Sequence, residues 1–294
     1  MAKKVIDDEF LSRVETLQML VKNNVAGMFG GNHKSKSYGS SCEFSDYREY
    51  IPGDDITKID WNVYARFENL YTKLYLDERQ MHTRIYIDAS RSMGFGKGRK
   101  DEQALKIAAT LAYLSVCEMD KVSIYAIRDN HLEEIIVGML GKDAYVSSIG
   151  KLNDIEFSGD SRMSDAIVPS SVGYGDGMSI IISDFLTDND YERAIDHLAS
   201  KKRHVLCIQV LSKEEIAPRA RGKMHFFDSE ELARTYRKNI TRDIIKAYRQ
   251  AVDYATGRIR NFCAVRGADY MLVQSEENIG EVFFKRLVNE GVLK

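Results

Sequence analysis

The stretch RIYIDASRS, at residues 84–92, decides the fold class. Its first half is a short β-branched and aromatic run, which is typical of a buried strand. Asp88, Ser90 and Ser92 then follow at alternate positions, where the apolar run ends. We expect a strand at Arg84–Asp88 and a tight loop that turns three oxygen-bearing side chains toward one point.

The same alternation of apolar runs and amphipathic stretches continues to the C-terminus. Further strands are predicted at Lys121–Ile127, Glu133–Val137, Met178–Ser183, His204–Val210 and Ala268–Val273. Helices are predicted at Asp101–Met119, Ala144–Leu152, Arg162–Ser171, Tyr191–Ser200, Ile240–Arg266 and Ile279–Asn289. Repeated strand–helix alternation implies an α/β fold with a mostly parallel central sheet flanked by helices.

The first 80 residues have a different pattern. Apolar residues recur at helical spacing from Asp8 to about Met28, which predicts an amphipathic helix whose stripe packs on the rest of the chain. From Gly31 to about Gln80 the sequence is polar, and we expect little regular structure before a strand at Leu70–Leu76. The predicted division is therefore 1–80, a helix and an irregular extension, and 81–294, the sheet domain with a long C-terminal helix.

Composition narrows the function. The chain has 42 Lys and Arg against 44 Asp and Glu, so the basic excess that is typical of nucleic-acid binders is missing. Its four cysteines are far apart in the sequence and fit reduced thiols. Neither a signal peptide nor a membrane-spanning run is visible, and we expect a cytoplasmic location.

Two further loops are expected beside the Asp88 loop. Ligands of such sheets bind outside the carboxyl ends of the strands, and Asp184 directly follows the strand predicted at Met178–Ser183. Ser161 precedes a predicted helix and would add a hydroxyl. Carboxylate and hydroxyl oxygens suit a hard divalent cation, so Mg²⁺ is expected, with Mn²⁺ and Ca²⁺ as alternatives.

These five residues resemble the metal-ion-dependent adhesion site of von Willebrand factor A domains. The DxSxS motif is matched by Asp88, Ser90 and Ser92, the threonine of the second loop by Ser161, and the aspartate of the third loop by Asp184. The resemblance implies a von Willebrand factor A-like fold. It also implies that an Asp or Glu of a partner protein completes the coordination of the ion.

A second resemblance comes from the extension. Residues 44–62, FSDYREYIPGDDITKIDWN, with Gly31-Asn32-His33 before them and Ala65-Arg66 after them, look like the signature of the family called domain of unknown function 58 (DUF58). The resemblance continues to the C-terminal strand. It implies partnership with a MoxR-type AAA+ ATPase in chaperone-like assembly.

The favoured interpretation is a non-enzymatic, metal-dependent protein-interaction module. One alternative is a metal-dependent hydrolase with His33 or an aspartate near Asp54 as base, although the three loops contain no His, Cys or Lys. Another is a structural adaptor with an empty site. The acidic cluster Asp54, Asp55 and Asp60 is interpreted as a salt-bridged platform, and the basic residues of a helix around Tyr236–Arg260 as a solvated surface.

Overall fold

The computed structural model describes residues 4–24, 34–38, 44–78, 81–95, 98–175, 177–186, 191–218, 222–227 and 235–283. The chain forms two compact units: Met1–Phe29 together with Met81–Lys294, and Gly30–Gln80. The sequence division grouped the N-terminal helix with the extension, whereas the structure groups it with the sheet domain.

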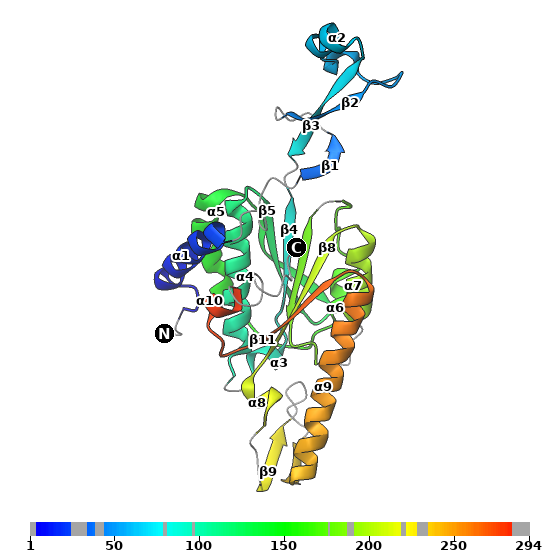
Figure 1. Cartoon of the computed structure of the whole chain (residues 1–294). Helices are drawn as coiled ribbons and strands as arrows, with labels where there is room; N and C mark the ends of the chain where they lie inside the picture. The colour runs from blue at the N-terminus through cyan, green and yellow to red at the C-terminus, as the bar shows by residue number, and fades with distance from the viewer. Residues whose placement is uncertain are drawn as a thin grey trace. The chain divides into compact units, whose positions relative to one another are not determined.

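A six-stranded sheet forms the centre of the larger unit (Figure 1). Its strands are β4 (His82–Asp88), β5 (Lys121–Arg128), β6 (His131–Met139), β7 (Met178–Ser183), β8 (His204–Leu211) and β11 (Asp269–Gln274). They lie in the order β11-β8-β7-β4-β5-β6, and only the β5–β6 pair is antiparallel. The chain winds outward from β4 to β6 and then from β7 to β11, so the winding reverses between β4 and β7. The mostly parallel sheet predicted from the sequence is confirmed, and this reversal is where such sheets place their ligands.

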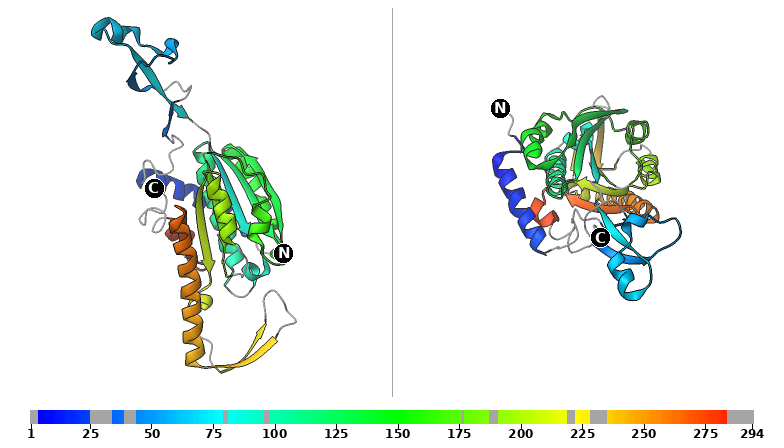
Figure 2. Two further views of the ribbon diagram at one scale, coloured as in Figure 1. Left: turned by 90° about the vertical axis from the view of Figure 1, so that its right-hand side faces the viewer. Right: turned by 90° about the horizontal axis from the view of Figure 1, so that it is seen from above.

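Helices cover both faces of this sheet (Figures 1 and 2). One face carries α1 (Asp8–Asn24), α4 (Lys100–Cys117), α5 (Gly141–Ser148), η2 (Ile149–Asp154) and α10 (Ile279–Glu281), and the other carries α6 (Met163–Ile167), α7 (Tyr191–Ser200) and α9 (Arg242–Val265). Ala104, Ala108 and Ala112 are fully buried, because small side chains let α4 approach the strands closely. Phe10 and Val14 of α1 join the same core, as the apolar stripe predicted.

Several predicted helices differ in extent, and three of them differ most clearly at one end. α6 was predicted to reach Ser171 but ends at Ile167, because Pro169 has no amide hydrogen to continue the helix. α9 begins at Arg242 after the Thr241 cap, and Thr235–Ile240 is instead a strand, β10, paired with β9 (Gly222–Phe227). α10 covers Ile279–Glu281, and the end of the helix predicted to Asn289 lies outside the described residues.

The smaller unit is more regular than predicted. It holds an antiparallel sheet in the order β1-β3-β2, made of β1 (Lys34–Tyr38), β2 (Phe44–Glu49) and β3 (Tyr71–Glu78). Two short helices, η1 (Ile56–Lys58) and α2 (Trp61–Phe67), connect β2 to β3. The expectation of little regular structure before Leu70 was wrong. The two short helices are stabilised by polar caps rather than by an apolar stripe. Asp55 caps η1, and Asp60 caps α2 by accepting from the amides of Asn62 and Val63.

The three aspartates of this unit have structural partners. Asp54 pairs with Arg48 at 2.6 Å, and Asp55 accepts from Thr57. Asp60 lies 3.1 Å from Lys73 Nζ, and this interaction lowers its pKa to about 2. These contacts agree with the platform interpretation of the acidic cluster.

Candidate metal centre

The loop after β4 places two predicted ligands deep in the carboxyl edge of the sheet. Asp88 and Ser90 are each 1% exposed. Asp88 Oδ1 accepts from the Ser90 amide at 3.0 Å, and Asp88 Oδ2 accepts from the Ser183 hydroxyl at 2.5 Å. Ser90 is also the N-cap residue of α3 (Arg91–Gly94), so the chain turns sharply there. The DxSxS segment is thus a strand-ending turn whose carboxylate is fixed on both oxygens.

The loop after β7 brings Asp184 to the same place. Ser92 Oγ donates to Asp184 Oδ2 at 2.9 Å, and the Ser90 and Ser92 hydroxyl oxygens are 3.1 Å apart. Phe185 has a left-handed backbone, with φ at 50°, and its amide donates to Ser183 Oγ at 3.0 Å. A non-glycine residue in this conformation costs free energy, which is typical of positions that aim a functional side chain.

Ser161 comes from a loop that is bonded to the first one. The Arg91 amide donates to the Gly159 carbonyl at 3.1 Å, and the Ser158 amide donates to the Ala89 carbonyl at 2.8 Å. Ser161 itself is 1% exposed. The structure therefore joins Asp88, Ser90, Ser92 and Asp184 by direct hydrogen bonds and brings the Ser161 loop alongside.

Gly159 lies where the Ser161 loop passes close to Asp129. Its φ is +76°, and a Cβ added there would lie 2.7 Å from Asp129 Oδ1. That carboxylate in turn accepts from the Asp160 amide at 3.0 Å, and Ser161 forms a bridge with Asp129. A side chain at position 159 would therefore require a left-handed backbone and would displace the Asp129 carboxylate of the β5–β6 turn, which holds the Ser161 loop.

Lys100, at the start of α4, was missed by the sequence analysis. Its Nζ lies 2.7 Å from Asp184 Oδ2 and 2.6 Å from Glu215 Oε1, and its side chain is 3% exposed. Glu215 belongs to α8 (Lys213–Ile216), where it forms a capping box with Ser212. The one signal in the sequence is a basic residue in the first turn of a helix, where the helix dipole disfavours positive charge.

Charge in the site is unevenly balanced. Burial lowers the pKa of Lys100, but the carboxylates of Asp184 and Glu215 outweigh that effect and the net shift is upward, so the ammonium stays protonated. Burial and the nearby Asp184 raise the pKa of Asp88. Among the described residues, no basic side chain pairs with Asp88.

The donor set fits a hard divalent cation. Two carboxylates and hydroxyl groups are the ligands that Mg²⁺ takes, with water in its remaining positions. Within the described residues, no group of three or more His, Cys, Asp and Glu could hold a metal. The candidate centre is of a different type, since three of its five predicted residues are serines.

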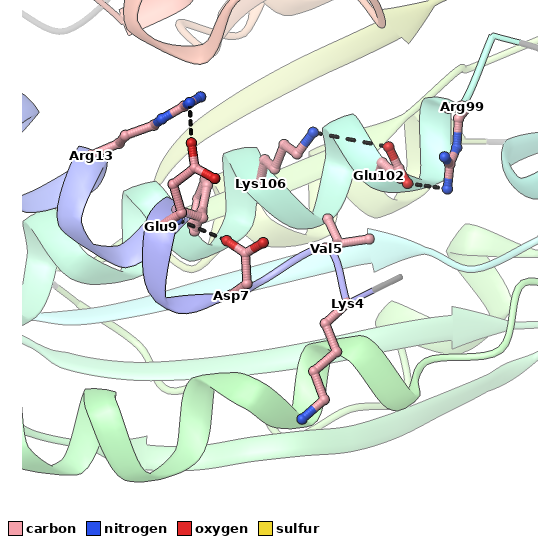
Figure 3. A pocket seen from close by; sticks show the side chains of 9 residues that line it. Lys4, Val5, Asp7, Glu9, Arg13, Arg99, Glu102 and Lys106 are labelled. Atoms are coloured by element: carbon pink, nitrogen blue, oxygen red, sulfur yellow. Dashed lines mark hydrogen bonds and ion pairs between the residues drawn. The ribbon is translucent and has the colours of Figure 1, made fainter. Parts of the chain in front are cut away.

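A separate hollow lies beside α1 and α4, with a volume of about 290 Å³ (Figure 3). Its charged groups are largely satisfied: Arg13 pairs with Glu9, and Glu102 pairs with Arg99 and with Lys106 at 3.9 Å.

The doubly wound sheet with an antiparallel edge strand, and polar loops meeting at its carboxyl edge, define an α/β domain of the class expected from the sequence. The family model described as "Protein of unknown function DUF58" matches residues 46–256, and the chain belongs to this family.

Curated relatives include uncharacterized proteins of Mycobacterium tuberculosis and Mycobacterium bovis, each 25% identical over 215 residues, which is 71% of this chain and 68% of theirs. Among solved structures, the hypothetical protein BatB of Bacteroides thetaiotaomicron is 15% identical, with a TM-score of 0.43, and covers 72% of this chain and 98% of its own. The SpRpn10 VWA domain is 10% identical, with a TM-score of 0.35. The match covers 69% of this chain and 92% of that domain. Within the described part of this chain, every helix is too short or too polar to cross a membrane.

Proposed function

We propose that this chain is a non-enzymatic module that binds a protein partner through a divalent cation. Asp88, Ser90, Ser92 and Ser161 would hold the ion, directly or through water, and Asp184 would help to balance its charge. Mg²⁺ is the expected ion, with Mn²⁺ and Ca²⁺ as alternatives. A carboxylate of the partner would take an open coordination position.

One observation carries the proposal: the Asp88 carboxylate is buried without a basic partner among the described residues, in a turn lined by hydroxyls. An uncompensated buried carboxylate is costly, and a bound cation would remove that cost. Lys100 supports a binding role rather than hydrolysis, because an ammonium held between two carboxylates is a poor proton acceptor.

The partner is proposed to be a MoxR-type AAA+ ATPase or its client, on the basis of membership of the DUF58 family. The proposed location is the cytoplasm, where the buried thiols Cys207 and Cys263 would stay reduced.

The test combines calorimetry with a pull-down. Wild type should bind Mg²⁺ and retain a co-purifying ATPase that chelator releases. Asp88→Asn should lose both while its circular dichroism spectrum stays unchanged, and Asp165→Asn, a change at an exposed residue of α6, should lose neither. A folded Asp88→Asn protein that still binds Mg²⁺ and its partner as wild type does would contradict the proposal.

A further inference from the structure

A second cavity lies toward the opposite edge of the sheet, at the amino ends of β4 and β5. It has a volume of about 470 Å³. The register pairs His82 with Lys121 and Tyr86 with Tyr125, so these residues share the face that α6 and α7 cover. Because α6 ends at Ile167, the amino half of this face is left open. The residues that line the cavity are His82, Arg84, Lys121, Tyr125, Leu132, Glu134, Val137, Ala166, Pro169, Ser170 and Ser171.

Polar side chains replace the usual apolar residues on this half of the face. His82 Nε2 is 2.9 Å from Ser123 Oγ, which also accepts from the Gly138 amide at 3.0 Å. Behind them, the Arg203 guanidinium donates to Ser179 Oγ at 2.7 Å and to the His82 carbonyl. The side chains of His82, Ser123, Ser179 and Arg203 are thus hydrogen bonded, so the shape of this polar floor is fixed before any ligand arrives.

Among the described residues, two cations at the cavity have no acidic partner. Arg84 donates to the Ser171 carbonyl at 2.9 Å, and neither Arg84 nor Lys121 forms an ion pair with a described carboxylate. The Nε of Arg84 is buried and lacks a hydrogen bond of normal geometry to a described group. Glu134 is the one carboxylate in the lining. This imbalance contrasts with the hollow beside α1, where the charges are largely paired.

Apart from Ser170 and Ser171, the rest of the lining is apolar or aromatic. Tyr125 is 6% exposed and stacks on Tyr86 at a ring-centroid distance of 5.4 Å, so its position is fixed. Leu132 and Val137 of β6 add aliphatic surface, and Val137 is 59% exposed. A concave site with apolar walls and a few converging charges is the usual form of a small-molecule pocket, and its volume is within the common range of about 300–1,000 Å³.

We propose that this cavity binds a small organic anion. Its phosphate or carboxylate group would lie against Arg84 and Lys121, and its apolar body would lie against Tyr125, Leu132 and Val137. Arginine and lysine favour oxyanions of either kind, so the shared chemistry is the oxyanion. The site is independent of the candidate metal centre, because the two lie toward opposite ends of β4.

Calorimetric titration with phenyl phosphate, benzoate and inorganic phosphate tests this assignment. The titrations are made with the full chain in chelator, so that a metal ion cannot hold the anion at the other edge. Phenyl phosphate should bind more tightly than inorganic phosphate because it adds the aromatic contact. Comparison with benzoate shows whether the pocket prefers a phosphate or a carboxylate, and tight binding of either supports the assignment.

Single substitutions in the cavity should change the affinity for phenyl phosphate in opposite directions. Lys121→Gln and Arg84→Gln should weaken phenyl phosphate binding, the second by about tenfold, because it removes a charge-assisted hydrogen bond. Glu134→Gln should tighten binding by removing a like charge, and Lys151→Gln, at an exposed residue of η2, should have no effect. Lys121 is exposed, so its variant stays informative if Arg84→Gln fails to fold. The assignment is overturned if none of the three probes binds, or if Lys121→Gln and Glu134→Gln do not shift the affinity in opposite directions.

Discussion

Replacing Lys100 with methionine should have opposite effects on stability and on metal affinity. Methionine keeps much of the length of lysine but removes the ammonium, the one basic group that pairs with Asp184 among the described residues. Without metal, the change leaves two carboxylates uncompensated, and the side chains of Lys100 and Asp184 are both 3% exposed. Breaking a buried pair of this kind costs about 3–5 kcal/mol. The melting temperature should fall by on the order of 10 °C.

With Mg²⁺ the sign reverses, because the removed ammonium repels an ion held in the adjacent loop. At a separation of roughly 7 Å and an effective dielectric constant of about 20, the repulsion is about 2 kcal/mol per unit charge of the ion. Side-chain relaxation and solvent reduce this value, so we expect the dissociation constant for Mg²⁺ to fall by about tenfold. Saturating Mg²⁺ should therefore restore more of the melting temperature in the variant than it adds in wild type.

The assay is a thermal melt with and without Mg²⁺, together with calorimetric titration of the ion. Lys106→Met is the matched control, because Lys106 lies on the same helix, its side chain is 33% exposed, and its nearest acidic group is Glu102 at 3.9 Å. That change should shift stability by less than about 1 kcal/mol and leave ion affinity unchanged. A Lys100→Met protein that is as stable as wild type, or that binds Mg²⁺ more weakly, would refute the reasoning.

Two further predictions concern the fold around the sites. Burial, followed by the nearby cations Arg84, Arg203 and Lys121, lowers the pKa of His82 from 6.5 to about 4. The folded state thus favours neutral His82, and this contribution is present above pH 6.5 and is lost as the pH falls toward 4. Because His82 is partly exposed to solvent, this contribution to the free energy of unfolding is about 1–2 kcal/mol. In urea denaturation, His82→Gln should therefore lose less stability between pH 7 and pH 4 than wild type. An equal loss would contradict the lowered pKa of His82. Gly159→Ala should lower the free energy of unfolding by about 1–3 kcal/mol and weaken Mg²⁺ binding, because its Cβ would meet Asp129. Gly150→Ala is the control, since a Cβ there has open space and should change stability little. Equal effects of the two changes in urea and Mg²⁺ titrations would show that the Gly159 loop tolerates a side chain.

The sheet could be predicted from the sequence because most of its strands are short runs rich in β-branched residues. Met178–Ser183 and Tyr191–Ser200 match the structure at both ends. The extension could not be predicted in the same way, because Asp55 and Asp60 form its short helices by capping, and side-chain caps leave no apolar period. The predicted length of α6 was wrong for a different reason. Its apolar residues suggested a longer helix, but Pro169 ends it early.

The residues of the candidate centre also fall into a group that could be predicted from the sequence and a group that could not. Asp88, Ser90, Ser92 and Asp184 follow strand ends that the sequence reveals, so their meeting could be predicted, and the Ser92–Asp184 hydrogen bond realises it. Lys100 and Glu215 could not be predicted, because their contact joins residues 115 positions apart and neither belongs to a metal-binding motif.

The two unforeseen residues change the charge balance of the centre. Asp88, Asp184 and Glu215 carry three formal negative charges when ionised, and Lys100 returns one positive charge, so this cluster is left with a net charge of minus two. That deficit equals the charge of one divalent cation. Since Lys100 already offsets part of the charge at Asp184, the remaining deficit is greatest at Asp88, which is also where the hydroxyls of Ser90 and Ser92 gather. An ion bound there would retain more of its positive charge than one between two uncompensated carboxylates, and would attract a further carboxylate from outside more strongly. Lysine at position 100 thus favours an ion that recruits an acidic partner over one that the chain alone neutralises.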